Sequence, residues 1–136
     1  WQEDGRVYAK HWDEAAHFLP KATAVIISQE DLLDDEMLGQ FRQWSKLLVM
    51  TRGWDGCTIF QGEEVCQIPA PQVEEVEPTG AGDIFATAFL LRYLETDGDA
   101  CEAGRYANFV TSQSVTQVGL EAKLTYIQTR LKEYDL

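Results

Sequence analysis

The sequence EPTGAGD, residues 77–83, is followed directly by IFATAFLL, residues 84–91. Glycine lets the backbone turn tightly and lets its N–H groups approach another group closely. The residues that follow are small or apolar at helical spacing, so a helix is predicted to begin at this turn. Its unpaired N–H groups and the positive end of its dipole would face the turn, which makes an anion site. Asp83 lies in the first turn of that helix, where it would cap the helix or act as a base beside the anion.

The composition is that of a globular protein with one modest core. The chain has 136 residues, of which 45% are hydrophobic, and a formal net charge of -12. Such a surface repels the backbone of nucleic acids and anionic lipid, so neither is an expected partner. A phosphate-bearing substrate remains compatible with this charge, because backbone amides and Mg²⁺ hold phosphate without basic side chains.

Three cysteines make an odd count without a CxxC spacing, and no apolar run is long enough to span a bilayer. We therefore expect reduced thiols, no structural zinc and a cytoplasmic location. The chain begins at Trp1 rather than at a methionine. We expect it to be a piece of a longer polypeptide.

The order of predicted elements indicates an α/β fold. Buried strands are expected at residues 22–27 and 46–51, a β-hairpin at 57–60 and 64–68, and an edge strand at 73–76. Helices are expected at residues 31–44, 80–94 and 100–118, the last one ending at Gly119, with a closing helix to about Tyr134. We predict one domain over residues 1–136, with a largely parallel sheet flanked by helices.

Taken together, these residues resemble a known family. TGAGD at 79–83, within residues 77–85, is similar to the C-terminal signature of the PfkB (ribokinase-like) carbohydrate kinases. Three companions follow the order of that family: SQED at 28–31, TRGWDG at 51–56, and YAN at 106–108 together with Gly119. The resemblance covers about residues 22–119. A glycine turn alone would be a weak signal, but a turn with three ordered companions is a specific one.

The resemblance implies ATP-dependent phosphorylation of a sugar hydroxyl. The amides of Gly80, Ala81 and Gly82 would form an anion hole for the transferring phosphoryl group. Asp83 would be the base that takes the proton from the substrate hydroxyl. Both assignments agree with the reading from the residues alone, since phosphoryl transfer needs positioning and charge stabilisation.

The resemblance also implies where the cofactors bind. The nucleotide would be held by five residues: Thr51, Gly53, Gly56, Thr79 and Asn108. Glu30 and Asp31 would help to hold Mg²⁺ through water. The cofactors implied are ATP and Mg²⁺, with a monovalent cation as a further candidate.

The sequence departs from the family pattern in several ways. Glu77 stands where the family usually has Asp, Ser28 where many members have Asn, and Asp31 where they have Glu. The largest departure is that the N-terminal half and the lid, which supply most sugar contacts, are missing. We therefore expect this chain to be the ATP-binding and catalytic-base portion of a longer kinase, and to be inactive alone. A homodimer of the full-length protein is a further candidate, since the sequence does not fix the oligomeric state.

Other interpretations remain open. Gly53 and Gly56 could be ordinary turn glycines, and Asn108 a helix residue without a ligand. Glu30 and Asp31 begin a helix, where acids are expected in any case. The whole could be a non-catalytic nucleotide-binding or regulatory module, or a kinase of the same superfamily for a nucleoside or a vitamin precursor. The presence of Asp83 favours catalysis.

Overall fold

The computed structural model describes residues 2–134, which form two compact units. The first unit contains the residues up to Arg52 together with Thr58–Gln67. The second contains Gly53–Cys57 and the residues from Ile68 onward.

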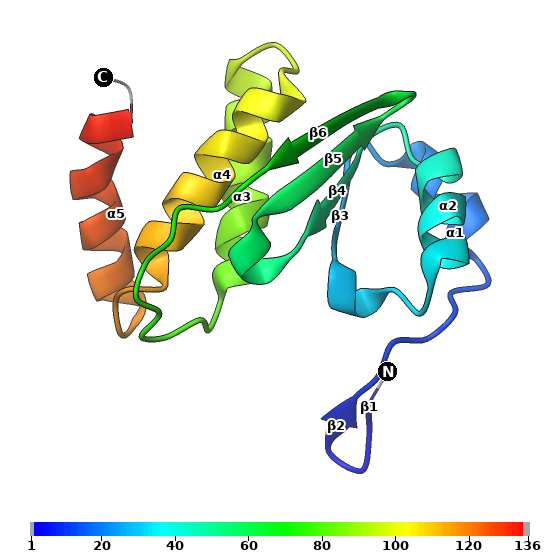
Figure 1. Cartoon of the computed structure of the whole chain (residues 1–136), viewed down its shortest axis with the longest axis horizontal. Coiled ribbons are helices and arrows are strands. Elements are labelled where there is room, and N and C mark those ends of the chain that lie inside the picture. Colours follow the sequence, from blue (N-terminus) through cyan, green and yellow to red (C-terminus); the bar gives the residue numbers. More distant parts are fainter. Residues whose placement is uncertain (1, 135–136) are drawn as a thin grey trace. The chain divides into compact units, whose positions relative to one another are not determined.

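A four-stranded sheet in the order β3-β4-β5-β6 dominates the first unit (Figure 1). Its strands are Val25–Ser28, Leu48–Thr51, Cys57–Gln61 and Glu64–Ile68. β3 and β4 run parallel, with Ser28 opposite Thr51 at their carboxyl ends. β5 and β6 are neighbours joined through Gly62 and Glu63, as expected for a hairpin, so the sheet is mixed. Two short strands, β1 (Gln2–Glu3) and β2 (Arg6–Val7), form a separate antiparallel pair.

Short helices supply the rest of the first core. They are α1 (Ala15–Phe18), α2 (Asp35–Trp44) and the 3₁₀ helices η1 (Leu19–Lys21) and η2 (Gln29–Asp31). α2 begins later than expected, because the Asp34 carboxylate caps it by accepting the Met37 N–H at 2.8 Å. The buried cluster of this unit consists of Ala15, Leu19, Met37, Phe41, Leu48, Met50 and Phe60.

Three long helices make the second unit: α3 (Ala81–Glu95), α4 (Ala100–Ser114) and α5 (Leu120–Tyr134). α3 and α4 lie side by side (Figure 1). Small buried residues on α4, Ala103 and Ala107 among them, let the two helices approach closely. On α3, Phe85 and Phe89 are buried and stack on each other.

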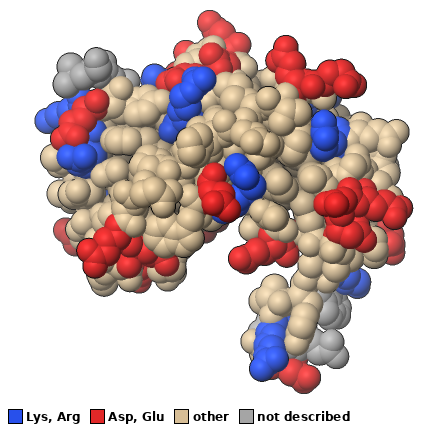
Figure 2. All heavy atoms as spheres, viewed as in Figure 1, with Lys and Arg blue, Asp and Glu red and all other residues tan. Residues whose placement is uncertain are grey.

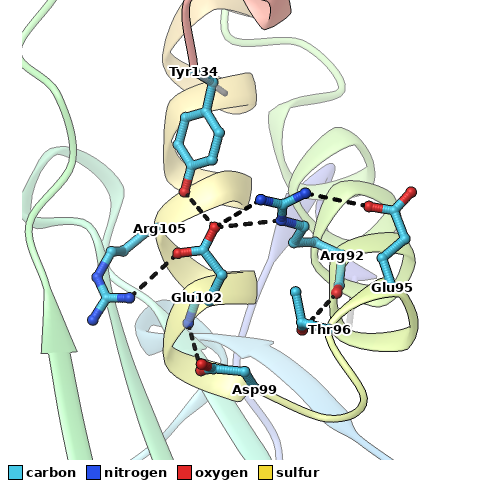
Figure 3. A network of polar contacts seen from close by, with 7 residues as sticks. All are labelled: Arg92, Glu95, Thr96, Asp99, Glu102, Arg105 and Tyr134. Atoms are coloured by element: carbon cyan, nitrogen blue, oxygen red, sulfur yellow. Dashed lines mark hydrogen bonds and ion pairs between the residues drawn. The ribbon is translucent and has the colours of Figure 1, made fainter. Parts of the chain in front are cut away.

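Glu102 of α4 joins the three helices (Figure 3). One of its carboxylate oxygens accepts a hydrogen bond from Arg92 of α3 at 3.1 Å and from the Tyr134 hydroxyl of α5 at 3.0 Å. The Asp99 carboxylate caps α4 by accepting the Glu102 N–H at 2.9 Å. This network fixes the C-terminal end of α5 on the α3–α4 pair.

Two expected boundaries were wrong, and one carbonyl explains both. Residues 73–76 are not a strand. Instead, the N–H groups of Val76 and Glu77 both donate to the Val115 carbonyl, at 2.8 and 3.0 Å. Because these distant amides take up that carbonyl, α4 ends at Ser114 rather than at 118. Gly119, with φ of 80°, therefore precedes α5 instead of ending α4.

The cysteine expectation was also wrong in part. Cys57 is buried and belongs to no disulfide, whereas Cys66 and Cys101 are disulfide-bonded. An odd count without CxxC spacing excludes a dense disulfide framework, but it does not require every thiol to be reduced. The thiol state therefore no longer supports a cytoplasmic location.

Acidic side chains are spread over much of the face drawn in Figure 2, with basic side chains interspersed among them. This agrees with the formal net charge of -12. Within residues 2–134, no helix is both long enough and apolar enough to cross a membrane.

Candidate active site

The glycine turn, residues 77–83, leads into α3 through a left-handed residue. Gly80 has φ of 81° and ψ of 2° and is the N-cap of the helix, a conformation that glycine adopts without a steric penalty. The Ala81 N–H donates to the Pro78 carbonyl at 3.0 Å, and the Ile84 N–H donates to the Gly80 carbonyl at 3.0 Å. These two bonds close the turn.

The turn leaves several amides unbonded at the positive end of the helix. Within the part of the chain that the structure describes, the N–H groups of Gly80, Gly82 and Asp83 have no hydrogen-bond acceptor. The Ala81 N–H, expected to join the anion hole, is already used by Pro78. The Asp83 N–H was not among the amides that the sequence suggested. Unpaired amides at a helix N-terminus are suited to bind an anion.

The Asp83 side chain is exposed and takes no part in capping the helix. Its carboxylate has no partner among residues 2–134, and only its backbone carbonyl is engaged, accepting the Thr87 hydroxyl at 2.8 Å. A carboxylate that is accessible beside free amides can accept a proton from a group held there.

Gly82 is a glycine that the fold does not require. It lies inside the first turn of α3 without a positive φ, and a Cβ built on it would have nothing within 4 Å. Glycine inside a helix costs about 0.5–1 kcal/mol relative to alanine. Packing within the described part of this chain therefore does not account for the glycine.

Hydrogen bonds of Glu77 and Lys123 fix the beginning of the glycine turn. The Glu77 carboxylate accepts the Gly119 N–H at 2.8 Å and lies 3.4 Å from the Lys123 ammonium. Lys123 also donates to the carbonyls of Glu77 and Thr79, at 2.9 and 2.8 Å. The Gly119 hydrogen bond, followed by the Lys123 ammonium, lowers the pKa of Glu77. Sequence reasoning missed Lys123, because a lysine near a helix start usually faces solvent.

A groove lies beside Gly119 in the same unit. It is lined by residues of the segment before α5 and of its first turns, Val118, Leu120 and Tyr126 among them. Val118 and Leu120 are 66% and 68% exposed. Apolar side chains left exposed around a groove offer a surface on which a flat ring can be buried.

Asn108 and Gly56 meet the same short backbone segment. Asn108 is buried, and its side-chain amide donates to the Ile68 carbonyl at 3.1 Å. Gly56 has φ of 89°, and a Cβ there would overlap the Ile68 carbonyl oxygen and lie 2.6 Å from the Ala70 nitrogen. Packing thus accounts for Gly56, whereas Gly53, with φ of 54°, has open space around it.

The remaining candidate residues lie in the first unit, after the parallel strands. Thr51 ends β4, and its hydroxyl donates to the Ile27 carbonyl at 3.2 Å. Asp31 belongs to η2 after β3, where its carboxylate accepts the Ser28 N–H at 2.8 Å. The structure therefore places Thr51 near the carboxyl end of the strand pair, together with Glu30 and Asp31. Ligands of α/β proteins commonly bind at that edge.

The donors at this edge fit magnesium but not a closed metal cage. In the described portion of the chain, no three His, Cys, Asp or Glu side chains gather closely enough to hold a metal ion. Glu30 is exposed, and no described residue pairs with its carboxylate. Mg²⁺ is typically bound by one or two carboxylates with several waters, so these two side chains suit it.

Comparison with known proteins assigns the chain to a family. The model of the pfkB family of carbohydrate kinases matches residues 7–125, and the chain belongs to this family. A Pyrococcus horikoshii protein assigned as a sugar kinase is 34% identical over 99 residues, which are 72% of this chain. A ribokinase of Lactococcus lactis is 30% identical over 97 residues, which are 70% of this chain.

Solved structures agree with the sequence matches. An Escherichia coli protein assigned as ribokinase II, solved in complex with ATP and Mg²⁺, has a TM-score of 0.72 and 26% identity over 89% of this chain. The fold is ribokinase-like, as the sequence predicted. The chain covers only 32% of each of the two curated relatives and 42% of this solved structure.

Proposed function

We propose that this chain is the ATP-binding and catalytic-base portion of a kinase that transfers the γ-phosphoryl group of ATP to a hydroxyl of a sugar. The observation that carries the proposal is Gly82. Neither its φ nor its packing requires a glycine at this place in the helix, and it lies beside the unbonded amides and the unpaired Asp83 carboxylate. Membership of a carbohydrate kinase family and the sugar kinases among its relatives support the same class of reaction.

In this proposal the amides of Gly80, Gly82 and Asp83 bind the oxygens of the transferring phosphoryl group. These dipoles are fixed before the reaction begins, so they stabilise developing charge without reorganisation. The Asp83 carboxylate orients the substrate hydroxyl and takes its proton. Ala81 contributes to the site through the shape of the turn, because the Ala81 N–H donates the hydrogen bond that closes the turn.

The nucleotide contacts are proposed residue by residue. Gly53, Gly56 and Thr79 would flank its phosphates, and the groove beside Gly119 would take the base. Asn108 would act through the Ile68 backbone, to which its amide is bound. Thr51 would lie along the nucleotide phosphates.

Glu30 and Asp31 would hold Mg²⁺ through water, and the metal when bound would neutralise charge on the phosphate oxygens. An ATP and Mg²⁺ complex of a relative with the same fold supports these two cofactors. A cytoplasmic location, where ATP is available, is the expected one. We expect most sugar contacts to lie outside this chain, as would the interface of a homodimer if the full-length protein forms one, so the chain alone should not turn over substrate.

The test is a turnover assay of the whole protein that contains this chain, with MgATP and a panel of sugars, nucleosides and inositols. Asp83→Asn should lower kcat by about two to four orders of magnitude, with nucleotide affinity nearly intact. Asp35→Asn is the matched control, since Asp35 is also an acid in the first turn of a helix. An Asp83→Asn protein with near wild-type turnover would overturn the base assignment. A wild-type protein that binds nucleotide but phosphorylates nothing on the panel would favour a binding module.

A further inference from the structure

Lys123 is the only charged side chain among the described residues that is buried, with 3% of its surface exposed. Burial of an ammonium costs several kcal/mol unless hydrogen bonds and opposite charge compensate. A lysine on the outer face of a helix would not be buried to this extent. The groups that offset this cost are therefore the groups that the ammonium binds.

All three partners of the ammonium lie at the start of the glycine turn. Two are the carbonyls of Glu77 and Thr79, at 2.9 and 2.8 Å, and the third is the Glu77 carboxylate at 3.4 Å. An ammonium has three N–H donors, so this set uses its full capacity. Because Lys123 belongs to α5 and its partners precede α3, it ties the turn to a separate helix.

The Thr79 carbonyl determines the direction of an amide in the anion hole. It belongs to the peptide unit that also carries the Gly80 N–H, and in a planar trans peptide the two groups point in opposite directions. When Lys123 draws the Thr79 carbonyl toward α5, the Gly80 N–H is turned away from α5. The lysine thus acts on the anion hole without touching an anion.

We propose that Lys123 is a positioning residue, a tethered cation that fixes the glycine turn in the geometry that binds the phosphoryl group. This inference rests on the proposed function for its effect on catalysis. Its structural part stands independently: loss of the ammonium loosens the turn more than it loosens the rest of the unit. Carbonyl and carboxylate oxygens also coordinate monovalent metal ions, so a soluble cation can replace the ammonium once the side chain is shortened.

The experiment compares Lys123→Met with Lys132→Met in the whole protein, since Lys132 is an exposed lysine on the same helix. Amide exchange measured by NMR reports on the turn through the bonded N–H groups of Ala81 and Ile84. In Lys123→Met these should exchange about tenfold faster relative to the α4 amides. The kcat should fall about a hundredfold with a smaller change in the KM for ATP. Lys132→Met should match the wild type in both measurements.

Rescue separates positioning from simple loss of structure. Ethylammonium or potassium ions should restore part of the turnover of Lys123→Ala and slow the exchange of Ala81 and Ile84. If Lys123→Met does not fold, Glu77→Gln carries the same exchange measurement, because it removes one of the three partners of the ammonium. Unchanged exchange at Ala81 and Ile84 relative to α4 would overturn the inference. Faster exchange in a protein whose wild type phosphorylates nothing would support the positioning part and refute the proposed kinase reaction.

Discussion

Glu77 and Gly119 are joined by a hydrogen bond of 2.8 Å from the Gly119 N–H to a carboxylate oxygen of Glu77. This bond ties the beginning of the glycine turn to the residue before α5. Together with Lys123 it keeps the Glu77 carboxylate ionised, since both lower its pKa from the ordinary value of 4.5.

Acid should therefore weaken the protein through Glu77. A lowered pKa in the folded state gives stability that is complete above the unfolded pKa and is lost as the pH falls through the folded pKa. We expect wild type to exceed Glu77→Gln in free energy of unfolding by a constant amount above about pH 5, and the difference to shrink below pH 4.5. Denaturant titrations over this pH range measure it. Glu75→Gln, at an exposed neighbour, is the control, and a pH-independent difference for Glu77→Gln would contradict the prediction.

Gly56→Ala should destabilise the fold strongly, because it combines a positive φ with overlap of backbone atoms. Strain of the left-handed conformation and overpacking together should lower the free energy of unfolding by more than about 2 kcal/mol. Gly53→Ala is the matched control, since its φ is also positive but its surroundings are open. It should cost about 1 kcal/mol. Equal losses for the two variants in denaturant unfolding would show that the overlap at Gly56 is relieved at little cost.

Asn108→Ala should remove a buried hydrogen bond and leave the Ile68 carbonyl without its donor. Such a loss costs about 1–3 kcal/mol of stability. If Asn108 acts only through this backbone, Asn108→Ala should change stability and alter the KM for ATP only modestly. A large rise in that KM with unchanged stability would instead indicate direct contact with the nucleotide. Both quantities can be measured on the same preparation of the whole protein.

The sequence predicted those elements whose signals are local. The hairpin of β5 and β6 was expected within one residue, because Gly62 marks a two-residue turn between two β-rich runs. The end of α4 was misplaced, since it depends on the Val115 carbonyl being bonded by Val76 and Glu77. No window of sequence around residue 115 contains that information.

The same distinction applies to the candidate site. The glycine turn and Asp83 were predicted, because a glycine turn before a helix is a local pattern. Lys123 was not, since the carbonyl of Thr79 that it binds lies 44 residues away in the sequence. The hydrogen bond from the Ala81 N–H to the Pro78 carbonyl likewise depends on a backbone geometry that composition does not reveal.

Alkaline pH should act on the helix network through Tyr134. Burial, and then the hydrogen bond to Glu102, raise the pKa of Tyr134 to about 12 from its ordinary value of 10. The neutral phenol therefore contributes stability that is complete below pH 10 and is lost as the pH rises toward about 12. The difference in unfolding free energy between wild type and Tyr134→Phe should shrink over that range. Tyr126→Phe on the same helix is the control, and a constant difference for Tyr134→Phe would contradict the assignment.

Gly82→Ala should move stability and activity in opposite directions. Its Cβ meets nothing within 4 Å in this chain, and its φ is not positive, so alanine should raise the free energy of unfolding by about 0.5–1 kcal/mol. The same methyl group would stand where the phosphoryl group must approach the backbone amides, so kcat should fall. Gly39→Ala in α2 is the matched control, because it is another helix glycine with open surroundings and ordinary φ. It should give the same gain in stability with unchanged turnover. A Gly82→Ala protein that is more stable and equally active would mean that no ligand approaches this turn closely, and the anion hole would have to be placed elsewhere.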